Sequence, residues 1–277
     1  PDSVYPIFRS ESKENLARIL GHEENVHLHN LVVDLNSGKE EAFRAGHEAK
    51  HAENYRINSF HLGEGSPKQK FRANMDAIYT LKALENQHRD ATPEEQETLA
   101  NYVGWGGLAD AFDAEKTAWT GEYKELKAAL TEEEYAAARA STLNAHYTSP
   151  TVIRAIYEAL DGMGFEKGNI LEPSMGVGNF FGMLPDSMLG SRLYGVELDS
   201  ITGRIAQKLY PQAEIKVAGF ETTDRRDFYD LAVGNVPFGN YRVSDKPYDK
   251  LGFSIHNYFF AKALDQVRPG GIVAFVT

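Results

Sequence analysis

The spacing of hydrophobic positions changes partway along the chain. Before about residue 144, apolar residues recur at helical intervals, and Thr92 and Thr131 each begin a capping box, with a glutamate three residues later. Together these signals predict helices over 70–87, 92–102 and 131–140. The first 70 residues are polar and only weakly periodic, so helices and loops are expected there. The region 1–143 is therefore predicted to be mainly α-helical.

From residue 144 onward, short apolar runs alternate with helical segments. Strands are predicted over 169–172, 192–197, 214–217, 228–233 and 272–276, and helices over 151–160, 179–188, 200–210 and 255–267. This alternation is typical of an α/β domain with a doubly wound, mostly parallel sheet, whose ligands bind at the carboxyl ends of the strands. Because the chain ends inside a predicted core strand, we expect the domain 144–277 to be incomplete at its C-terminus.

A glycine-rich turn follows the first predicted strand, in Glu172-Pro-Ser-Met-Gly176-Val-Gly178. Glycines let a backbone approach a ligand closely, and a helix starting near Gly178 would direct N–H groups at it. A dinucleotide fingerprint would need a third glycine where Phe181 stands, and Glu172 would repel a pyrophosphate. An acid here suits the cationic cofactor S-adenosylmethionine. The alternatives are a dinucleotide site or a tight turn that binds nothing.

Two further strand ends carry residues suited to an adenosine. Glu197 ends the second predicted strand, where a carboxylate can accept both ribose hydroxyls. Phe220 and Glu221 follow the third, where the ring could stack on adenine and the carboxylate could accept its amino group. The alternative roles are a helix cap for Glu197, a core position for Phe220 and an exposed position for Glu221.

The segment Asn235-Val236-Pro237-Phe238 follows the fourth predicted strand. A carboxamide and a neighbouring backbone carbonyl can accept both hydrogens of an –NH₂ group, while an aromatic ring stacks on the planar group that carries it. Such a site is suited to methylating an amino nitrogen of a flipped base or of an amide.

Composition limits the partners and the chemistry. The 277 residues include no cysteine, so thiolate metal sites and cysteine nucleophiles, and with them cytosine-C5 methylation, are excluded. The sequence contains no membrane-span or signal-peptide pattern, so a cytoplasmic location is expected. The net charge is −11, and residues 1–144 carry 16 Lys and Arg against 25 Asp and Glu. A DNA substrate would therefore need a local basic patch or parts outside this chain.

These motifs resemble those of the amino-methylating DNA methyltransferases. Tyr147-Thr148-Ser149-Pro150 looks like that group's N-terminal cofactor motif, 172–180 like its glycine motif, and 235–238 like its catalytic motif. Their order is similar to the gamma arrangement of adenine-N6 enzymes. The segments 102–107, 234–239 and 255–262 also look like the methylase portion of large methylase–helicase proteins encoded on bacterial plasmids and conjugative elements.

The resemblance implies a Rossmann-like methyltransferase fold, S-adenosylmethionine as cofactor, adenine N6 of DNA as acceptor, and a helicase domain fused elsewhere. It places Tyr147 and Thr148 at the methionine end of the cofactor. The glycine motif adds the cofactor-binding residues Pro173, Ser174, Gly176, Gly178 and Phe180. Val236 replaces the usual first proline of the catalytic motif. Two alternatives therefore remain: an amide N-methyltransferase of proteins or small molecules, and a non-catalytic cofactor-binding scaffold.

Three other features are less directly tied to this chemistry. His47-Glu-Ala-Lys-His51 matches the H-E-x-x-H pattern of zinc proteases, but its flanks are polar and no third ligand follows, so we expect a solvated helix and no metal. Trp105, between glycines, is either a lid over the cofactor or a buried indole at a helix end. Lys262 is expected on a solvated helix face.

Overall fold

A computed structural model describes residues 52–57, 63–142, 148–239 and 241–277, and residues 52–277 form one compact unit. The H-E-x-x-H segment at 47–51 and Tyr147 lie outside the described residues.

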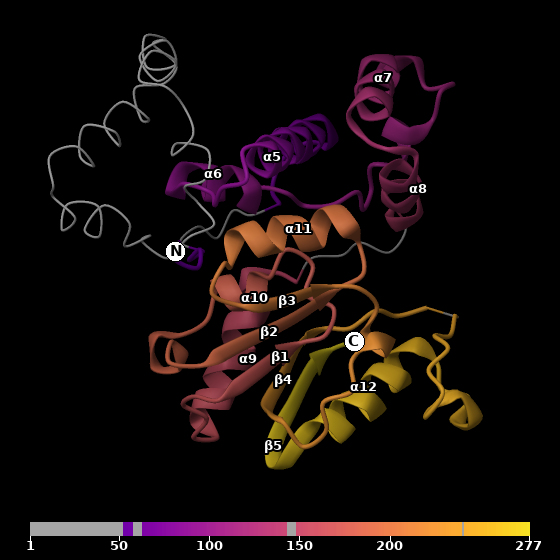
Figure 1. The fold of residues 1–277 in the computed structure, drawn as a ribbon. Helices are drawn as coiled ribbons and strands as arrows, with labels where there is room; N and C mark the ends of the chain where they lie inside the picture. Colours follow the sequence, from indigo (N-terminus) through magenta and orange to yellow (C-terminus); the bar gives the residue numbers. More distant parts are fainter. Residues whose placement is uncertain (1–51, 58–62, 143–147, 240) are drawn as a thin grey trace, which may run out of the picture. The chain divides into compact units, whose positions relative to one another are not determined.

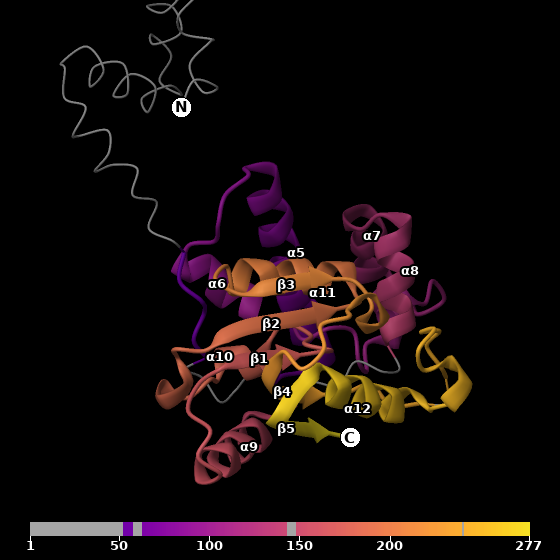
Figure 2. The same cartoon turned by 60° about the horizontal axis from the view of Figure 1, so that its bottom comes forward.

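The centre of this unit is a five-stranded sheet in which every pair of neighbouring strands is parallel (Figure 1). The strands are β1 (Asn169–Glu172), β2 (Arg192–Glu197), β3 (Glu214–Val217), β4 (Tyr229–Asn235) and β5 (Val267–Val276). Their order across the sheet, β3-β2-β1-β4-β5, can be followed in Figure 2. The chain leaves β1 in one direction and β4 in the other, which makes the β1/β4 boundary the switch point of a doubly wound, Rossmann-like sheet. The predicted fold class is confirmed.

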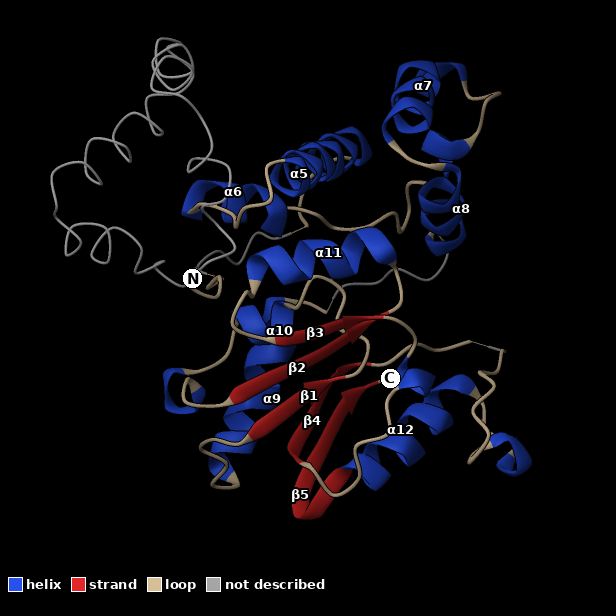
Figure 3. Cartoon of the chain, in the orientation of Figure 1, coloured by secondary structure: helices blue, strands red, loops and turns tan. Residues whose placement is uncertain are grey.

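Helices cover both faces of the sheet (Figure 3). One face packs with α9 (Pro150–Gly162), α10 (Asn179–Gly182) and α11 (Ser200–Leu209), and the other with α12 (Ile255–Gln266). Successive strand residues point to opposite faces, so Ile170 belongs to the first core and Leu171 to the second. The central strands β1 and β4 are buried on both sides, which explains their nearly continuous apolar sequences.

The described segment 63–142 is mainly helical, as predicted for this part of the chain. It contains α5 (Pro67–Asn86), α6 (Pro93–Ala100), α7 (Thr120–Ala129), α8 (Glu132–Ser141) and the 3₁₀ turns η2 (Ala109–Phe112) and η3 (Thr117–Trp119). The Thr92 and Thr131 capping boxes are both present, and a third at Ser66 starts α5. Both α5 and α6 pack on α11, which joins this region to the sheet.

The largest differences from the predictions concern α10, β5 and α7. The helix expected over 179–188 ends at Gly182, and a 3₁₀ turn, η4 (Asp186–Met188), follows Pro185, because proline disfavours a helical residue before it. Strand β5 begins at Val267 rather than 272, with a register shift against β4 where a turn was expected. Helix α7 was not predicted.

Trp105 is a core residue rather than a lid. It is 1% exposed, and its ring packs against Phe71, Tyr102 and Phe112 at centroid distances of 6.1, 6.3 and 5.3 Å. The buried Asn74 fixes the adjoining turn: its Nδ2 donates to the Gly104 carbonyl at 2.6 Å and its Oδ1 accepts the Val103 N–H at 2.9 Å.

Candidate functional site

A cavity of about 480 Å³ lies at the carboxyl ends of the strands, at the switch point between β1 and β4. It brings together most of the residues singled out from the sequence, namely Thr148, Glu172, Pro173, Ser174, Gly176, Phe180, Glu197, Phe220, Glu221, Asn235, Val236, Pro237 and Phe238. Gly178 does not line it. Residues more than 60 positions apart in sequence thus share one wall, because parallel strands end at the same edge of the sheet.

The two glycines of the turn after β1 have different tasks. Both have positive φ, 56° at Gly176 and 81° at Gly178, which favours glycine. The Gly176 N–H faces the cavity region and donates to Glu197 Oε2 at 2.8 Å. A Cβ at Gly178 would meet the Tyr210 ring at 2.5 Å, so that glycine is required by packing under α10 rather than by contact with the cavity.

Glu172 is a buried acid with an unused oxygen. Its side chain is 2% exposed, and its Oε2 has no hydrogen-bond partner within the described residues. Burial, followed by the nearby charge of Glu197, holds the pKa of Glu172 well above its ordinary value. A cation in the cavity would supply the missing partner and stabilise the carboxylate form.

Glu197 is fixed by the backbone. Its Oε2 accepts the Gly176 N–H and its Oε1 accepts the Asp199 N–H, both at 2.8 Å. Burial raises its pKa to about 7, against the opposing effect of these N–H donors. Each oxygen keeps a further acceptor site, so hydroxyl groups of a ligand can donate to it. Asp199, not Glu197, caps α11 by accepting the Thr202 N–H at 2.8 Å.

Among the described residues, the side chains that line the cavity and can carry a full charge near neutral pH are all acidic. Four carboxylates border the cavity (Glu172, Glu197, Asp199 and Glu221), and no Lys, Arg or His is among its described lining residues. Such a wall suits a positively charged ligand and disfavours phosphate groups, which basic side chains and free N–H groups usually bind.

The turn after β3 forms the far end of the acidic half. The Phe220 ring stacks on Phe259 with a centroid distance of 5.0 Å and an interplanar angle of 30°. Lys262 was expected on a solvated face, but it is 3% exposed. Its Nζ donates to Asp245 Oδ2 at 2.6 Å and to the Glu221 carbonyl at 3.2 Å. These contacts offset the desolvation cost of burying the ammonium charge. Lys262 therefore supports this turn from behind.

The opposite half of the cavity is apolar and aromatic. Asn235 ends β4, and Phe238 and Tyr241 are 49% and 45% exposed at the mouth. Val236 is 1% exposed, and its N–H donates to the Val276 carbonyl at 3.2 Å, which extends the β4–β5 pairing by one bond. A proline at 236 could not make that bond, so the valine is matched to this backbone.

Sequence reasoning missed the contribution of the helical region. Tyr102 and Gly104, with Ala137, Ala140 and Ser141 of α8, also line the cavity. Tyr102 and Gly104 belong to the segment 102–107 that was noted for its resemblance, but no cavity role was predicted for them, and the three residues of α8 carry no motif. Only the packing of the helical region on the sheet brings them to the site.

Two further properties concern the described residues alone. They contain no group of three or more His, Cys, Asp or Glu side chains arranged to hold a metal ion. None of their helices is both long enough and apolar enough to cross a membrane.

No family model matches this sequence. Two relatives align with it, one over most of the chain and one over about a third. The chain is 28% identical over 220 residues to Defense against restriction protein B of Escherichia phage P1, which covers 77% of the chain and 8% of that protein. It is 34% identical over 92 residues to the type II methyltransferase M.CvrRI of Paramecium bursaria Chlorella virus XZ-6E, which covers 33% of the chain and 24% of that enzyme. The chain thus spans a small part of either relative.

Structural comparison finds distant neighbours. A Listeria monocytogenes protein assigned to the class I S-adenosylmethionine-dependent methyltransferases aligns with a TM-score of 0.39 and 13% identity, over 75% of this chain and 73% of that one. A Clostridium thermocellum protein assigned as an rRNA methylase aligns with a TM-score of 0.29 and 14% identity, over 46% and 72% of the respective chains.

Proposed function

We propose that this chain is an S-adenosylmethionine-dependent methyltransferase module that transfers a methyl group to N6 of a flipped adenine in DNA. The observation that carries the proposal is one cavity lined both by Glu172 and Glu197, which end β1 and β2, and by Asn235 and Phe238, at and just after the end of β4. A methyl donor and an amino acceptor need such adjoining sites to meet. The 34% identity of 92 residues to a type II methyltransferase supports the same chemistry.

The residues at the acidic end fit the proposed cofactor. S-adenosylmethionine supplies an electrophilic methyl group on a positively charged sulfur, and it also carries an ammonium group and a ribose. The unpartnered Oε2 of Glu172 suits the positive charge, and the backbone-fixed carboxylate of Glu197 suits the ribose hydroxyls. Phe220 and Glu221 would border the adenine, and Thr148 the methionine end.

The residues at the other end fit a planar amine. Asn235 Oδ1 and a neighbouring backbone carbonyl would accept the two amine hydrogens, which directs the nitrogen lone pair toward the methyl group. Phe238 would stack on the ring and Tyr241 would extend that wall at the mouth. The nitrogen–carbon bond forms as the carbon–sulfur bond breaks, and the extra proton on nitrogen leaves to water. Positioning and exclusion of water provide the rate enhancement.

A second candidate acceptor is a carboxamide of a protein or small molecule. It is favoured by one observation: no basic side chain lines the described cavity, whereas a nucleotide acceptor carries phosphates. The Asn235 site would hold an amide –NH₂ by the same two hydrogen bonds.

The deciding experiment measures transfer of a labelled methyl group from S-adenosylmethionine by this chain. The acceptors are an adenine-containing DNA, the same DNA with N6-methyladenine at every adenine, and glutamine-containing peptides. Transfer to the first DNA and not the second supports adenine N6, and transfer to peptides alone supports the amide acceptor. Cofactor binding by calorimetry without transfer to any acceptor would reject an enzymatic role in favour of a cofactor-binding scaffold.

A further inference from the structure

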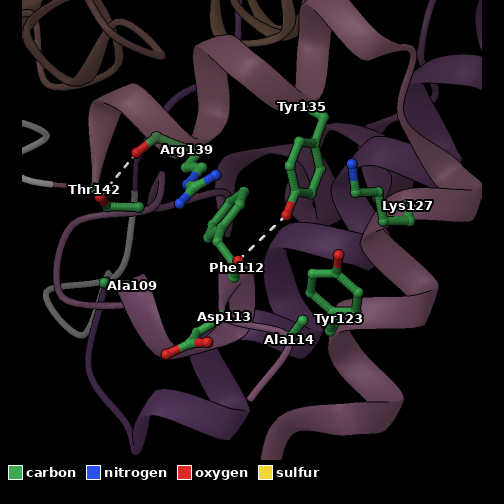
Figure 4. A pocket seen from close by; sticks show the side chains of 9 residues that line it. All are labelled: Ala109, Phe112, Asp113, Ala114, Tyr123, Lys127, Tyr135, Arg139 and Thr142. Carbon is green, nitrogen blue, oxygen red and sulfur yellow. Dashed lines mark hydrogen bonds between the residues drawn. The ribbon is translucent and has the colours of Figure 1, made fainter. Parts of the chain in front are cut away.

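A second hollow lies in the helical region, away from the carboxylates of the cavity. It has a volume of about 700 Å³ and is bordered by α7, α8 and η2. Figure 4 shows Lys127, Tyr135 and Arg139 around it, with Phe112 and Tyr123 between them. We name it the α7–α8 groove.

The charge of the groove is opposite to that of the region around it. Lys127 and Arg139 line it together with one acid, Asp113, although residues 1–144 carry an excess of nine negative charges. The Lys127 Nζ lies 3.9 Å from the centroid of the Tyr135 ring. Within the described part of the chain, neither cation forms an ion pair with a carboxylate. Both are exposed and available to an anion from solution.

Two of the three aromatic side chains that line the groove, Tyr135 and Phe112, are closed to stacking. Tyr135 is 8% exposed and its hydroxyl donates to the Phe112 carbonyl at 3.4 Å, while Phe112 itself is 5% exposed. A nucleobase would need an open ring face to stack on. Tyr123 is half-buried, and the exposed ends of Lys127 and Arg139 are the cationic groups that the groove offers, which suit phosphate groups.

Helix α8 separates the groove from the cavity. Successive helix residues are about 100° apart, so Tyr135, Arg139 and Thr142 share one face and Ala137, Ala140 and Ser141 the other. The first three residues line the groove and the second three line the cavity. The two sites are therefore about 10 Å apart, the thickness of one helix.

From this arrangement we propose that the α7–α8 groove binds a backbone phosphate of the DNA strand that carries the target base. The proposal rests on the DNA substrate proposed above. The described cavity wall offers no cation, so a base held there must leave its flanking phosphates outside. The groove supplies two cations on the outer face of the helix that forms part of that wall. A strand passing over α8 would place a base in the cavity and bring nearby phosphates to Lys127 and Arg139.

The first test removes both cations in Lys127→Gln/Arg139→Gln. The matched control is Lys124→Gln/Lys167→Gln, which loses the same charge from one position on α7 outside the groove and one before β1. Affinity for a fluorescent single-stranded oligonucleotide is measured over a range of salt concentrations. The groove variant should bind about tenfold more weakly, and the slope of log affinity against log salt should fall by about 2, one for each contact. The control should keep the native slope.

The second test locates the phosphate. An uncharged methylphosphonate replaces one phosphate at a time in the oligonucleotide. With the native chain, one position or two adjacent positions near the target adenine should weaken binding. With Lys127→Gln/Arg139→Gln, the same substitutions should have no further effect, because the interaction has already been removed.

Several results would overturn the proposal: no DNA binding at low salt, equal losses in the groove and control variants, or methylphosphonate effects that persist in the groove variant. Calorimetry with S-adenosylmethionine separates these results from failure of the proposed function, since the groove variant should bind the cofactor with native affinity. If DNA binding fails while peptides are methylated, the groove proposal is rejected and the cavity chemistry is retained. Far-UV circular dichroism and the melting temperature confirm that the variants are folded.

Discussion

Two parts of the cavity wall are lined by side chains of different chemistry. Around the glycine turn stand the carboxylates of Glu172, Glu197, Asp199 and Glu221, whereas beyond Asn235 the wall is formed by neutral and aromatic side chains. The acidic end pays a desolvation cost, seen in the raised pKa values of Glu172 and Glu197. The apolar end has no such cost.

This difference indicates how each end would select its ligand. A buried carboxylate without a partner is stabilised most strongly by a cation, so the acidic end favours positively charged ligands. The apolar end offers hydrogen-bond acceptors beside a flat aromatic surface, so it selects by shape and by an –NH₂ group. Substitutions at one end should therefore leave the affinity of the other largely unchanged.

Asn235→Ala should give the largest effect. Loss of the carboxamide removes an acceptor of the amine hydrogens, so methyl transfer should fall by about 10²–10³-fold or more, as for other positioned polar groups in active sites. Calorimetry should give a nearly native affinity for S-adenosylmethionine. Asn101→Ala, at the exposed end of α6, is the matched control and should transfer normally. Native transfer rates in Asn235→Ala would show that the catalytic assignment is wrong.

Glu172→Gln tests the acidic end. A hydrogen bond to a charged group contributes about 1.5–3 kcal/mol, so the affinity for S-adenosylmethionine should fall about 10- to 100-fold. Because burial already favours the neutral form of Glu172, the melting temperature of the free chain should stay equal or rise. Glu166→Gln, on the exposed loop before β1, should change neither quantity. An unchanged cofactor affinity in Glu172→Gln would contradict charge selection at this end.

A smaller effect is expected from pH. The pKa of Glu197 is raised from 4.5 to about 7 in the folded chain, so the unfolded chain loses this proton first and the free energy of unfolding should fall as pH rises between these values. A bound cation favours the carboxylate, so cofactor affinity should rise with pH up to about 7, by at most about tenfold per unit from this group. Calorimetry from pH 5 to 7.5 measures the rise, and Glu197→Gln should flatten it. A rise of native steepness in Glu197→Gln would assign it to another group.

Val236→Pro should have the smallest effect. It removes the hydrogen bond to the Val276 carbonyl, a loss of about 0.5–1.5 kcal/mol, seen as a drop of a few degrees in melting temperature. Methyl transfer should continue, because proline is usual at this position in the enzymes that the motif resembles. Val236→Ala keeps the N–H and separates the bond from the side chain. A large gain of transfer in Val236→Pro would instead show that the valine limits the reaction.

Local signals in the sequence predicted much of the fold. The bounds of β1, β2 and β3 agree with the predicted strands, since each short strand is bounded by turn-forming and polar residues. The capping boxes at Thr92 and Thr131 depend only on contacts three residues apart, so both were recognised. Helix α7 has no such cap: Trp119 stands at its N-cap without a side-chain hydrogen bond. It packs on α5 and on the neighbouring 3₁₀ turns, and that packing has no short-range signal.

By itself, the sequence predicted which strand ends would meet in one site, because the residue types of 172–178, 197 and 235–238 are set by local turns and by the ligands they suit. Tertiary structure decided the rest. It buried Lys262 against Asp245, turned Gly178 toward Tyr210, and used α8 as a wall between the cavity and the α7–α8 groove. The physical reason is distance: these environments depend on elements far apart in sequence, whose packing is fixed only when the whole core is buried at once.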